Sequence, residues 1–414
     1  MTSTTSHAPV FTLRSGATWA NPFGMYARLR SAAPVHRVAT GAASASDPGE
    51  YWVLTRHADV LAAASDPSTF SSADGLTVTY GELAAIGMTD NPPMVMTDPP
   101  AHTAFRRLVA RGFTPRQVSA LEPQIRDFVR ERLDRIDGAS DGPADIVGEL
   151  FKPLPSMVVA HYLGVPESDR AQFDGWTDAI VGASPDSPDA GPATLDMLGY
   201  FGRLIEYRRD HPADDTVSHL VAAGIADEDA GVLSVLAFTF TMVAGGNDTT
   251  TGMLGGSVEL LHRYPDQRAR LLDDPALIGD AVDEFLRLTS PVQNLARTTT
   301  RAVTLAGADG PVTIPAARKV LLCYAAANRD PQAFGPDAEH LDVGRRPRNI
   351  LTFSHGAHHC LGAAAARLAA RVTLTELLSR YPDFAVDVAG IRWAEGNYVR
   401  RPTYVPFYPS GVGA

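Results

Sequence analysis

Cysteine is scarce in this sequence, because only Cys323 and Cys360 occur among 414 residues. Two cysteines cannot form the disulfide network of a secreted scaffold, so a reducing cytoplasm is the expected location. A basic surplus is also missing: 36 Lys and Arg face 47 Asp and Glu, for a formal net charge of −11. This balance argues against a general nucleic-acid-binding protein and against attraction to an anionic membrane.

Long apolar runs are absent as well. The longest charge-free apolar stretch, residues 231–247, contains hydroxyl side chains and a glycine pair, and a membrane span needs roughly 20 apolar residues. We interpret it as a buried helix through a large domain and expect no membrane anchor. The N-terminus has neither the basic region nor the apolar run of a secretory signal. We expect residues 1–18 to be flexible and residues 19–414 to form one domain.

The patterns that are present are mostly helical, which predicts a mainly α domain with a small β portion. Helices are expected over 21–30, over most of 101–301, and from about 361 to 381. Short strands are expected at 35–38, 51–54, 312–314 and 319–322. Residues 71–100 read as a long loop of the kind that is usually functional, and residues 184–192 interrupt the helical region.

The densest group of reactive side chains lies in the stretch FSHGAHHCLG, residues 353–362. Cys360 stands at the start of a predicted helix, where the helix N-terminus favours a thiolate. His355, His358 and His359 could join it in a zinc site, although four ligands within six residues close a tetrahedron poorly. An inert buried cysteine is the other interpretation that the residues leave open.

A second group, AGGNDTT at residues 244–250, lies within the predicted central helix. Each glycine there costs about 1 kcal/mol relative to alanine, so Gly245 and Gly246 need a reason. Either tight helix packing or a flat group approaching the backbone would supply one. An acid beside an alcohol, Asp248 and Thr249, suits the delivery of protons.

Two further pairs are uninformative alone. Glu284 and Arg287 are three residues apart, and His102 and Arg106 are four apart, so each pair shares one helix face. Pairs of this kind are ordinary on solvated helices.

Together these motifs resemble those of the cytochrome P450 family. FSHGAHHCLGAAAAR fits the haem-binding signature F-x-x-G-x-H-x-C-x-G-x-x-x-A-R, with Ser354 where glycine is frequent and Ala365 where leucine is frequent. AGGNDTT is similar to the distal motif (A/G)-G-x-(D/E)-T-(T/S), and it lacks the Arg-Pro of the peroxide-using branch. The motifs occur in the family's order, and the resemblance spans about residues 21–406.

The resemblance implies a cytochrome P450 fold, a single large domain with a long central helix over haem b. It implies that Cys360 is the axial iron ligand and that the Gly362 N–H bonds to its sulfur. Gly245 would allow the cofactor to approach, and Asp248 and Thr249 would be catalytic. The implied propionate partners are His102, Arg106, Arg297 and His358. Glu284 and Arg287 would form a structural trio with Arg345.

The function implied is a haem-thiolate monooxygenase that inserts one oxygen atom of O₂ into a lipophilic small molecule, by hydroxylation or epoxidation. Electrons would come from a separate ferredoxin with its reductase, or from a flavodoxin-type partner, because no flavin or nicotinamide motif is visible. One alternative is another redox outcome, such as oxidative coupling or isomerisation. Another is a non-catalytic haem sensor, against which the Asp248–Thr249 pair argues.

Matching positions give the expected substrate pocket, which is mostly apolar with Gln293 and Asn294 as polar handles. Its walls are Met94, Val95, Thr241, Ala244, Val292, Gln293, Asn294, Leu295, Tyr398 and Val399. The helices around residues 184–192 would form a lid. Arg346 and Arg348, with Arg107 and Arg111 nearby, are the expected docking patch for the redox partner.

Overall fold

The computed structural model describes residues 10–41, 43–44, 46–137, 142–181 and 190–411. Within these ranges the α-helices are α1 (Phe23–Ala32), α2 (His57–Ser65), α3 (Glu82–Ala85), α4 (Ala101–Val109), α5 (Pro115–Ala120), α6 (Glu122–Asp137), α7 (Pro153–Leu163), α8 (Arg170–Val181), α9 (Ala190–Asp210), α10 (Thr216–Ala222), α11 (Asp229–Arg263), α12 (Pro265–Asp273), α13 (Ile278–Thr289), α14 (Tyr324–Ala327), α15 (Pro331–Phe334) and α16 (Ala363–Arg380). Short 3₁₀ turns include η2 (Met94–Met96) and η8 (Gly356–His358), and η4 (Val147–Phe151) is a π-helical turn.

The strands are short, and the largest sheet contains five of them. The strands are β1 (Val35–Ala39), β2 (Glu50–Leu54), β3 (Phe70–Ser71), β4 (Ala144–Asp145), β5 (Leu295–Thr299), β6 (Val303–Ala306), β7 (Pro311–Ile314), β8 (Lys319–Leu322), β9 (Ala385–Val386), β10 (Arg392–Trp393), β11 (Pro402–Tyr404) and β12 (Pro406–Tyr408). The main sheet has the order β1-β2-β8-β5-β3, and only the β2–β8 pairing is parallel. The structure is therefore mainly α with a small β portion, as expected.

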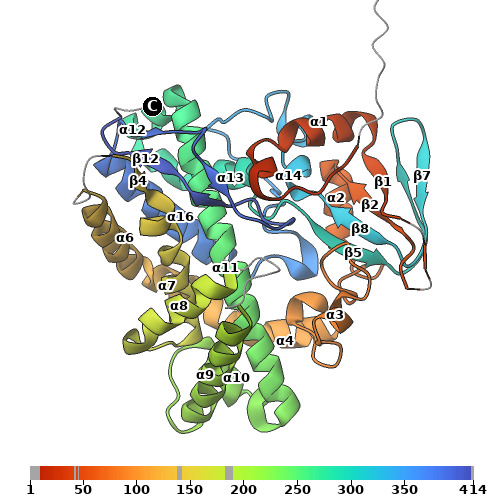
Figure 1. Ribbon diagram of the computed structural model, residues 1–414, viewed down its shortest axis with the longest axis horizontal. Coiled ribbons are helices and arrows are strands. Elements are labelled where there is room, and N and C mark those ends of the chain that lie inside the picture. Colours follow the sequence, from red (N-terminus) through yellow and green to blue (C-terminus); the bar gives the residue numbers. More distant parts are fainter. Residues whose placement is uncertain (1–9, 42, 45, 138–141, 182–189, 412–414) are drawn as a thin grey trace, which may run out of the picture.

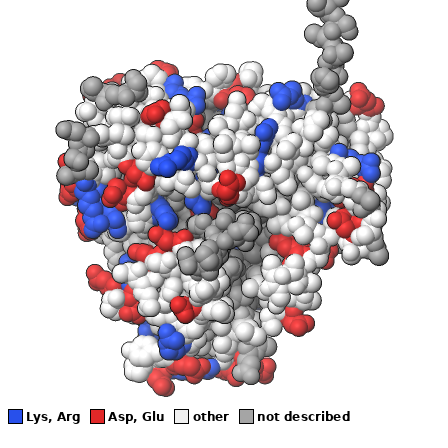
Figure 2. Space-filling model, in the orientation of Figure 1, with Lys and Arg blue, Asp and Glu red and all other residues white. Residues whose placement is uncertain are grey.

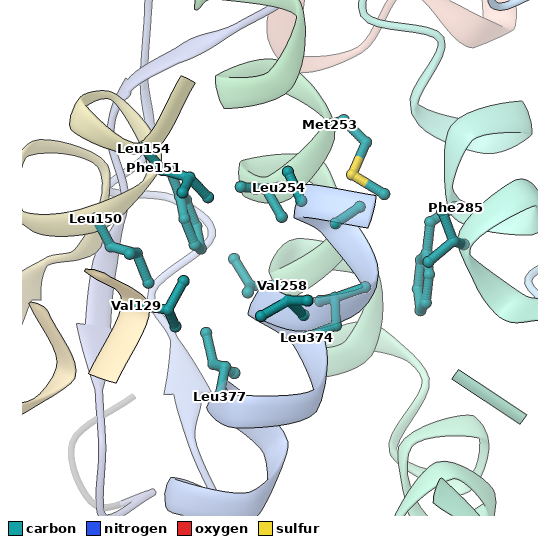
Figure 3. Close-up of a cluster of buried hydrophobic side chains, with 14 of the residues drawn as sticks. Val129, Leu150, Phe151, Leu154, Met253, Leu254, Val258, Phe285, Leu374 and Leu377 are labelled. Atoms are coloured by element: carbon teal, nitrogen blue, oxygen red, sulfur yellow. The ribbon is translucent and has the colours of Figure 1, made fainter. Parts of the chain in front are cut away.

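The long helix α11 crosses the middle of the molecule, with the other large helices mainly to its left and the main sheet to its right (Figure 1). Its apolar residues meet those of neighbouring helices in the largest buried cluster. Figure 3 shows Leu254 and Val258 of α11 beside Leu374 and Leu377 of α16, with Phe285 of α13 to their right. The predicted apolar stretch is thus a buried central helix, and its packing fixes the position of the residues around Asp248.

Helix α13 carries the predicted Glu284–Arg287 pair. Both side chains are completely buried, and Arg345 joins them with its Nε 3.2 Å from a Glu284 oxygen. The Arg287 guanidinium also donates to the carbonyl oxygens of Asn328 and Ala338, at 2.7 and 2.6 Å. The expected trio with Arg345 is confirmed, and it joins α13 to the irregular segment that precedes the Cys360 loop.

Several expected elements are confirmed within a residue or two, namely α1, β1, β2, β7, β8 and α16. The expectation that the helical region reaches residue 301 is wrong. Helix α13 ends at Thr289, where Ser290 has φ 37° and Pro291 follows, and Leu295–Thr299 then pair with β8 as strand β5. The expected loop 71–100 contains the short elements α3 and η2.

The ends of two expected segments also differ from the structure. Of the loop expected at 184–192, residues 184–189 lie outside the described residues, and Ala190 already begins α9. Of the N-terminal stretch 1–18, residues 1–9 lie outside the described part. Phe11 is buried with Met25 and Tyr51 in one apolar cluster, so part of the stretch that was expected to be flexible packs into the domain.

The described helices include none that is both long and apolar enough to cross a membrane. On the face shown in Figure 2, positive and negative side chains are interspersed, without a continuous basic surface.

Candidate active site

Cys360 lies in the turn between η8 and α16. Its backbone N–H donates to the Phe353 carbonyl at 2.8 Å, and the Gly362 N–H bonds to its sulfur. Burial raises the pKa of the thiol, while Gly362, Arg106 and Arg367 act to lower it. The residue nevertheless has exposed surface. Cys360 is therefore open to a ligand on its exposed side.

The turn before Cys360 depends on two residues with left-handed backbones. Gly356 has φ 66°, and an added Cβ there would lie 2.8 Å from the Ala64 carbonyl oxygen of α2. Ser354 has φ 57°, which explains why glycine is favoured at this position, and its hydroxyl lies 3.2 Å from that of Tyr324. The loop is thus held on one side by α2 and on the other by α14.

The zinc interpretation of this loop finds no support. Among the described residues, no group of three or more His, Cys, Asp or Glu side chains is placed to hold a metal ion. His355, His358 and His359 therefore do not converge on Cys360.

Four basic side chains from three separate segments do converge. His102 and Arg106 come from α4, Arg297 from β5 and His358 from η8. The rings of His102 and His358 have centroids 4.2 Å apart, and both ring nitrogens of His102 are buried without a hydrogen-bond partner. Burial, followed by Arg297, His102 and Arg106, lowers the pKa of His358 to about 3. Such a cluster needs an anionic ligand, because buried polar groups without partners are costly.

The glycine pair of α11 serves two purposes. An added Cβ at Gly246 would lie 2.7 Å from a methyl group of Val159, so Gly246 allows α7 to pack closely against α11. An added Cβ at Gly245 would meet nothing within 4 Å, and Gly245 is exposed. The packing interpretation is therefore confirmed for Gly246, whereas Gly245 borders open space.

Asp248 and Thr249 follow on the same helix. The Thr249 hydroxyl donates to the Gly245 carbonyl at 2.9 Å. Asp248 forms an ion pair with Arg401, with 2.6 Å between the carboxylate and Nε. Burial raises the pKa of Asp248 to about 6, although Arg401 and Lys152 both act to lower it. A carboxyl with a pKa near 6 can exchange protons at physiological pH.

Comparison with known proteins decides the family. The family model for cytochrome P450 matches residues 215–385. Cytochrome P450 130 of Mycobacterium tuberculosis is 63% identical over 412 residues, which cover 98% of this chain and 99% of that protein. The chain belongs to the cytochrome P450 family.

Two more distant P450s agree with this assignment. The vitamin D(3) 25-hydroxylase of Pseudonocardia autotrophica is 38% identical, over 98% of each chain. The solved structure of the P450 PksS, of the Bacillus subtilis bacillaene polyketide synthase, matches with a TM-score of 0.82 at 30% identity, over 97% of this chain and 100% of that one. The chain is a P450 monooxygenase, and the cofactor of its family is haem b.

The P450 site described above fits haem b in three respects. The unpartnered nitrogens of His102 provide hydrogen-bonding groups for carboxylates, and the surrounding cations provide charge. Gly245 leaves space for a flat group beside α11. Cys360 is an exposed residue whose sulfur already accepts a backbone hydrogen bond.

The expected walls of the P450 substrate pocket fall into two groups. Eight of the ten residues are partly exposed: Met94, Val95, Thr241, Ala244, Val292, Leu295, Tyr398 and Val399. Gln293 and Asn294 are buried, at 0% and 1% exposure. The Gln293 amide donates to the carbonyls of Thr289 and Ser290 instead of pointing into open space. The Gln293 amide nitrogen therefore bonds back to the end of α13, whereas the side-chain oxygens of Gln293 and Asn294 are buried without a partner.

Sequence reasoning missed three residues around this P450 site. Arg401 pairs with Asp248, Lys152 acts on the same carboxylate, and the Ser72 hydroxyl lies 3.2 Å from the His358 ring nitrogen. Each is far along the chain from its partner and belongs to no recognisable motif. Only Ser72 had an indirect signal, because it lies in the stretch 71–100 that was expected to be functional.

Proposed function

We propose that this P450 inserts one oxygen atom of O₂ into a lipophilic small molecule, by hydroxylation or epoxidation. In a hydroxylation, the C–H bond, O₂, two electrons and two protons give an alcohol and one water. The observation that carries the proposal is the Asp248–Thr249 pair, which lies on α11 immediately after the open space at Gly245. A protein that only binds haem has no use for an acid whose pKa lies near 6 at that position.

The chain's own residues would hold the cofactor. Cys360 would ligate the iron, with the Gly362 N–H bonded to its sulfur, and the propionates would bind His102, Arg106, Arg297 and His358. When bound, the haem supplies dioxygen activation, and thiolate ligation favours cleavage of the O–O bond. Ligation requires the thiolate, so cofactor binding must release the proton that burial favours on Cys360.

The proton path would use Asp248 and Thr249 in sequence. The Asp248 carboxylate takes a proton from solvent and passes it to water held by the Thr249 hydroxyl. The Thr249 hydroxyl donates to the Gly245 carbonyl, so its oxygen lone pairs face away from that carbonyl and can accept from water. The Thr249 hydroxyl lies next to the open space at Gly245, and the reacting dioxygen would be bound in that space.

The apolar pocket walls support a lipophilic substrate. Met94 and Val95 lie in η2, which packs against α11, and Val292 pairs with Val399. The side chains of these residues are hydrocarbon or thioether, which favours apolar ligands. The relative named as a vitamin D(3) 25-hydroxylase and the P450 of a polyketide synthase are consistent with this class.

A separate ferredoxin or flavodoxin would supply the electrons. Arg345, Arg346 and Arg348 line a surface hollow of about 470 Å³ beside α2 and α15. Arg346 is 77% exposed and forms an ion pair with Asp280, whereas the exposed Arg348 has no ion-pair partner among the described residues. Within the expected docking patch, the charge of Arg348 is therefore the one available to an acidic redox partner.

The test of the function is a ligand screen followed by isotope labelling. Compounds that convert the haem from low to high spin are turned over with a ferredoxin and its reductase under isotopically labelled O₂. The expected product contains one labelled oxygen atom per oxidation, as mass spectrometry would show. An oxidised product without label would overturn the proposal.

We place the enzyme in the cytoplasm, where its two free cysteines would stay reduced.

A further inference from the structure

Asp248 does not face solvent freely, because Arg401 covers it. Their ion pair is short, at 2.6 Å, and the two side chains are 22% and 10% exposed. Arg401 comes from the segment directly before β11, far along the chain from α11. The contact therefore depends on how this segment, residues 398–402, is held against the central helix.

Two glycines of α11 let that segment come close. An added Cβ at Gly252 would lie 2.7 Å from the Arg400 carbonyl oxygen and 3.5 Å from the Arg401 Cβ. An added Cβ at Gly255 would overlap Pro402. Gly252 is one helical turn after Asp248, on the same face of α11. Because the segment 398–402 approaches α11 closely at Gly252, the Arg401 side chain can reach the Asp248 carboxylate.

The neighbouring residue anchors the segment from the opposite side. The buried Arg400 donates to the Trp19 carbonyl at 2.8 Å and to Glu259 at 3.3 Å, and it lies 3.8 Å over the Trp393 ring. Its backbone N–H donates to Pro291 at 2.8 Å. Because Arg400 is fixed in this way, the side chain of the next residue, Arg401, is directed to Asp248.

The other charged group that acts on Asp248 is Lys152, which lies between η4 and α7. Lys152 makes no direct bond to the carboxylate and pairs instead with Asp178 of α8, at 2.9 Å. Arg401 is therefore the only one of the two cations for which a direct contact with Asp248 is recorded. Its charge favours the ionised carboxylate, whereas burial favours the protonated one.

We infer that Arg401 is a positioning residue for proton delivery, which fixes the Asp248 carboxylate beside Thr249 and sets the pH range in which it can supply protons. The inference rests on the proposed role of Asp248. It adds a residue that no motif of the chain indicates, and it assigns a function to the close approach at Gly252.

The first test is a direct titration of Asp248 in the complete haem protein. Carbon-13 spectra of aspartate-labelled protein would be recorded in the diamagnetic carbon monoxide complex, with Asp248→Asn to assign the signal. Arg401→Gln should raise the pKa of Asp248 by about 1 unit or more, because an opposite charge in contact typically lowers a carboxyl pKa by 1–3 units. Arg401→Lys should return most of the shift, and Lys152→Gln should produce a smaller one.

The second test measures product formation against pH at saturating substrate and electron donor, with a compound taken from the spin-state screen. Activity that needs protonated Asp248 falls as pH rises through its pKa, so Arg401→Gln should move this alkaline limb to higher pH. Gly252→Ala should move it in the same direction by displacing the segment without changing any charge. Gly175→Ala is the matched control, because its added Cβ meets nothing within 4 Å.

The outcomes are distinct. An unchanged Asp248 titration in both Arg401→Gln and Gly252→Ala, with the carbon monoxide spectrum intact, would overturn the inference. A purely structural Arg401 would lower stability and leave both the titration and the alkaline limb in place. Failure of the proposed function would appear separately, as a product without labelled oxygen, whatever the Asp248 titration shows.

Discussion

Glu284 and Arg287 form a double ion pair in which neither side chain has any exposed surface, with distances of 2.7 Å and 2.8 Å between their atoms. A buried pair of this kind is hard to break, because removal of one partner leaves the other charged and without compensation. The pair holds α13 to the segment that leads into the Cys360 loop.

Substitution of Glu284 should therefore destabilise the whole domain. Glu284→Gln is expected to reduce the free energy of unfolding by about 3–5 kcal/mol, the usual cost of breaking a buried ion pair. Denaturant titration followed by circular dichroism would measure it. Arg135→Gln breaks an exposed pair with Glu131 and should cost less than about 1 kcal/mol. Equal losses in the two variants would contradict the structural role of Glu284.

Cys360 should determine the spectrum of the haem protein. Reduced protein with carbon monoxide should show the strongly red-shifted Soret band of thiolate ligation, and Cys360→His should lose that band while still binding haem. Cys323→Ser is the control, because Cys323 is buried beside Tyr26 and has a pKa raised to about 12. A normal thiolate band in Cys360→His would refute the assignment.

Substitutions of Thr249 and Asp248 should impair turnover in different ways. Thr249→Ala is expected to keep consuming reductant while peroxide replaces product, because the hydroxyl that holds water is gone. Asp248→Asn should slow turnover by about 10²- to 10⁴-fold, the typical contribution of a positioned proton donor. Product, peroxide and donor consumption would be measured together. Unchanged coupling in Thr249→Ala would mean that another group holds the water.

If the docking patch binds the redox partner, the rate at which a ferredoxin reduces this protein should depend on ionic strength. Arg348→Glu is expected to slow reduction by a ferredoxin most strongly at low salt, because screening acts over roughly 8–10 Å at 0.1–0.15 M. Arg346→Glu is a less clean variant, because it also places a second acid beside Asp280. Arg203→Glu, at an exposed arginine of α9 that forms no ion pair among the described residues, is the matched control. Stopped-flow reduction at wild-type rate in Arg348→Glu would place the patch elsewhere.

The parts of the site that could be predicted from the sequence are those whose residues form short, continuous motifs. The Cys360 loop and the Gly245–Thr249 turn each depend on neighbours within one helical turn or one tight loop, and the structure places both as elements around open space. The contact between Arg401 and Asp248 joins α11 to a distant strand, and the close approach at Gly252 that permits it has no sequence pattern. The same limit applies to β5, because the residues after Pro291 follow a helix directly and are strands only through pairing with β8.

The convergence of His102, Arg106, Arg297 and His358 also bears on the amount of enzyme in a cell. Both ring nitrogens of His102 are buried without a partner beside Arg106 and Arg297, so an anionic ligand would add hydrogen bonds and charge pairing to the native state. A ligand that binds only the native state stabilises it in proportion to the logarithm of its free concentration. We therefore expect molecules that lack the cofactor to unfold and be degraded more readily than loaded ones, so that haem supply would influence how much enzyme accumulates.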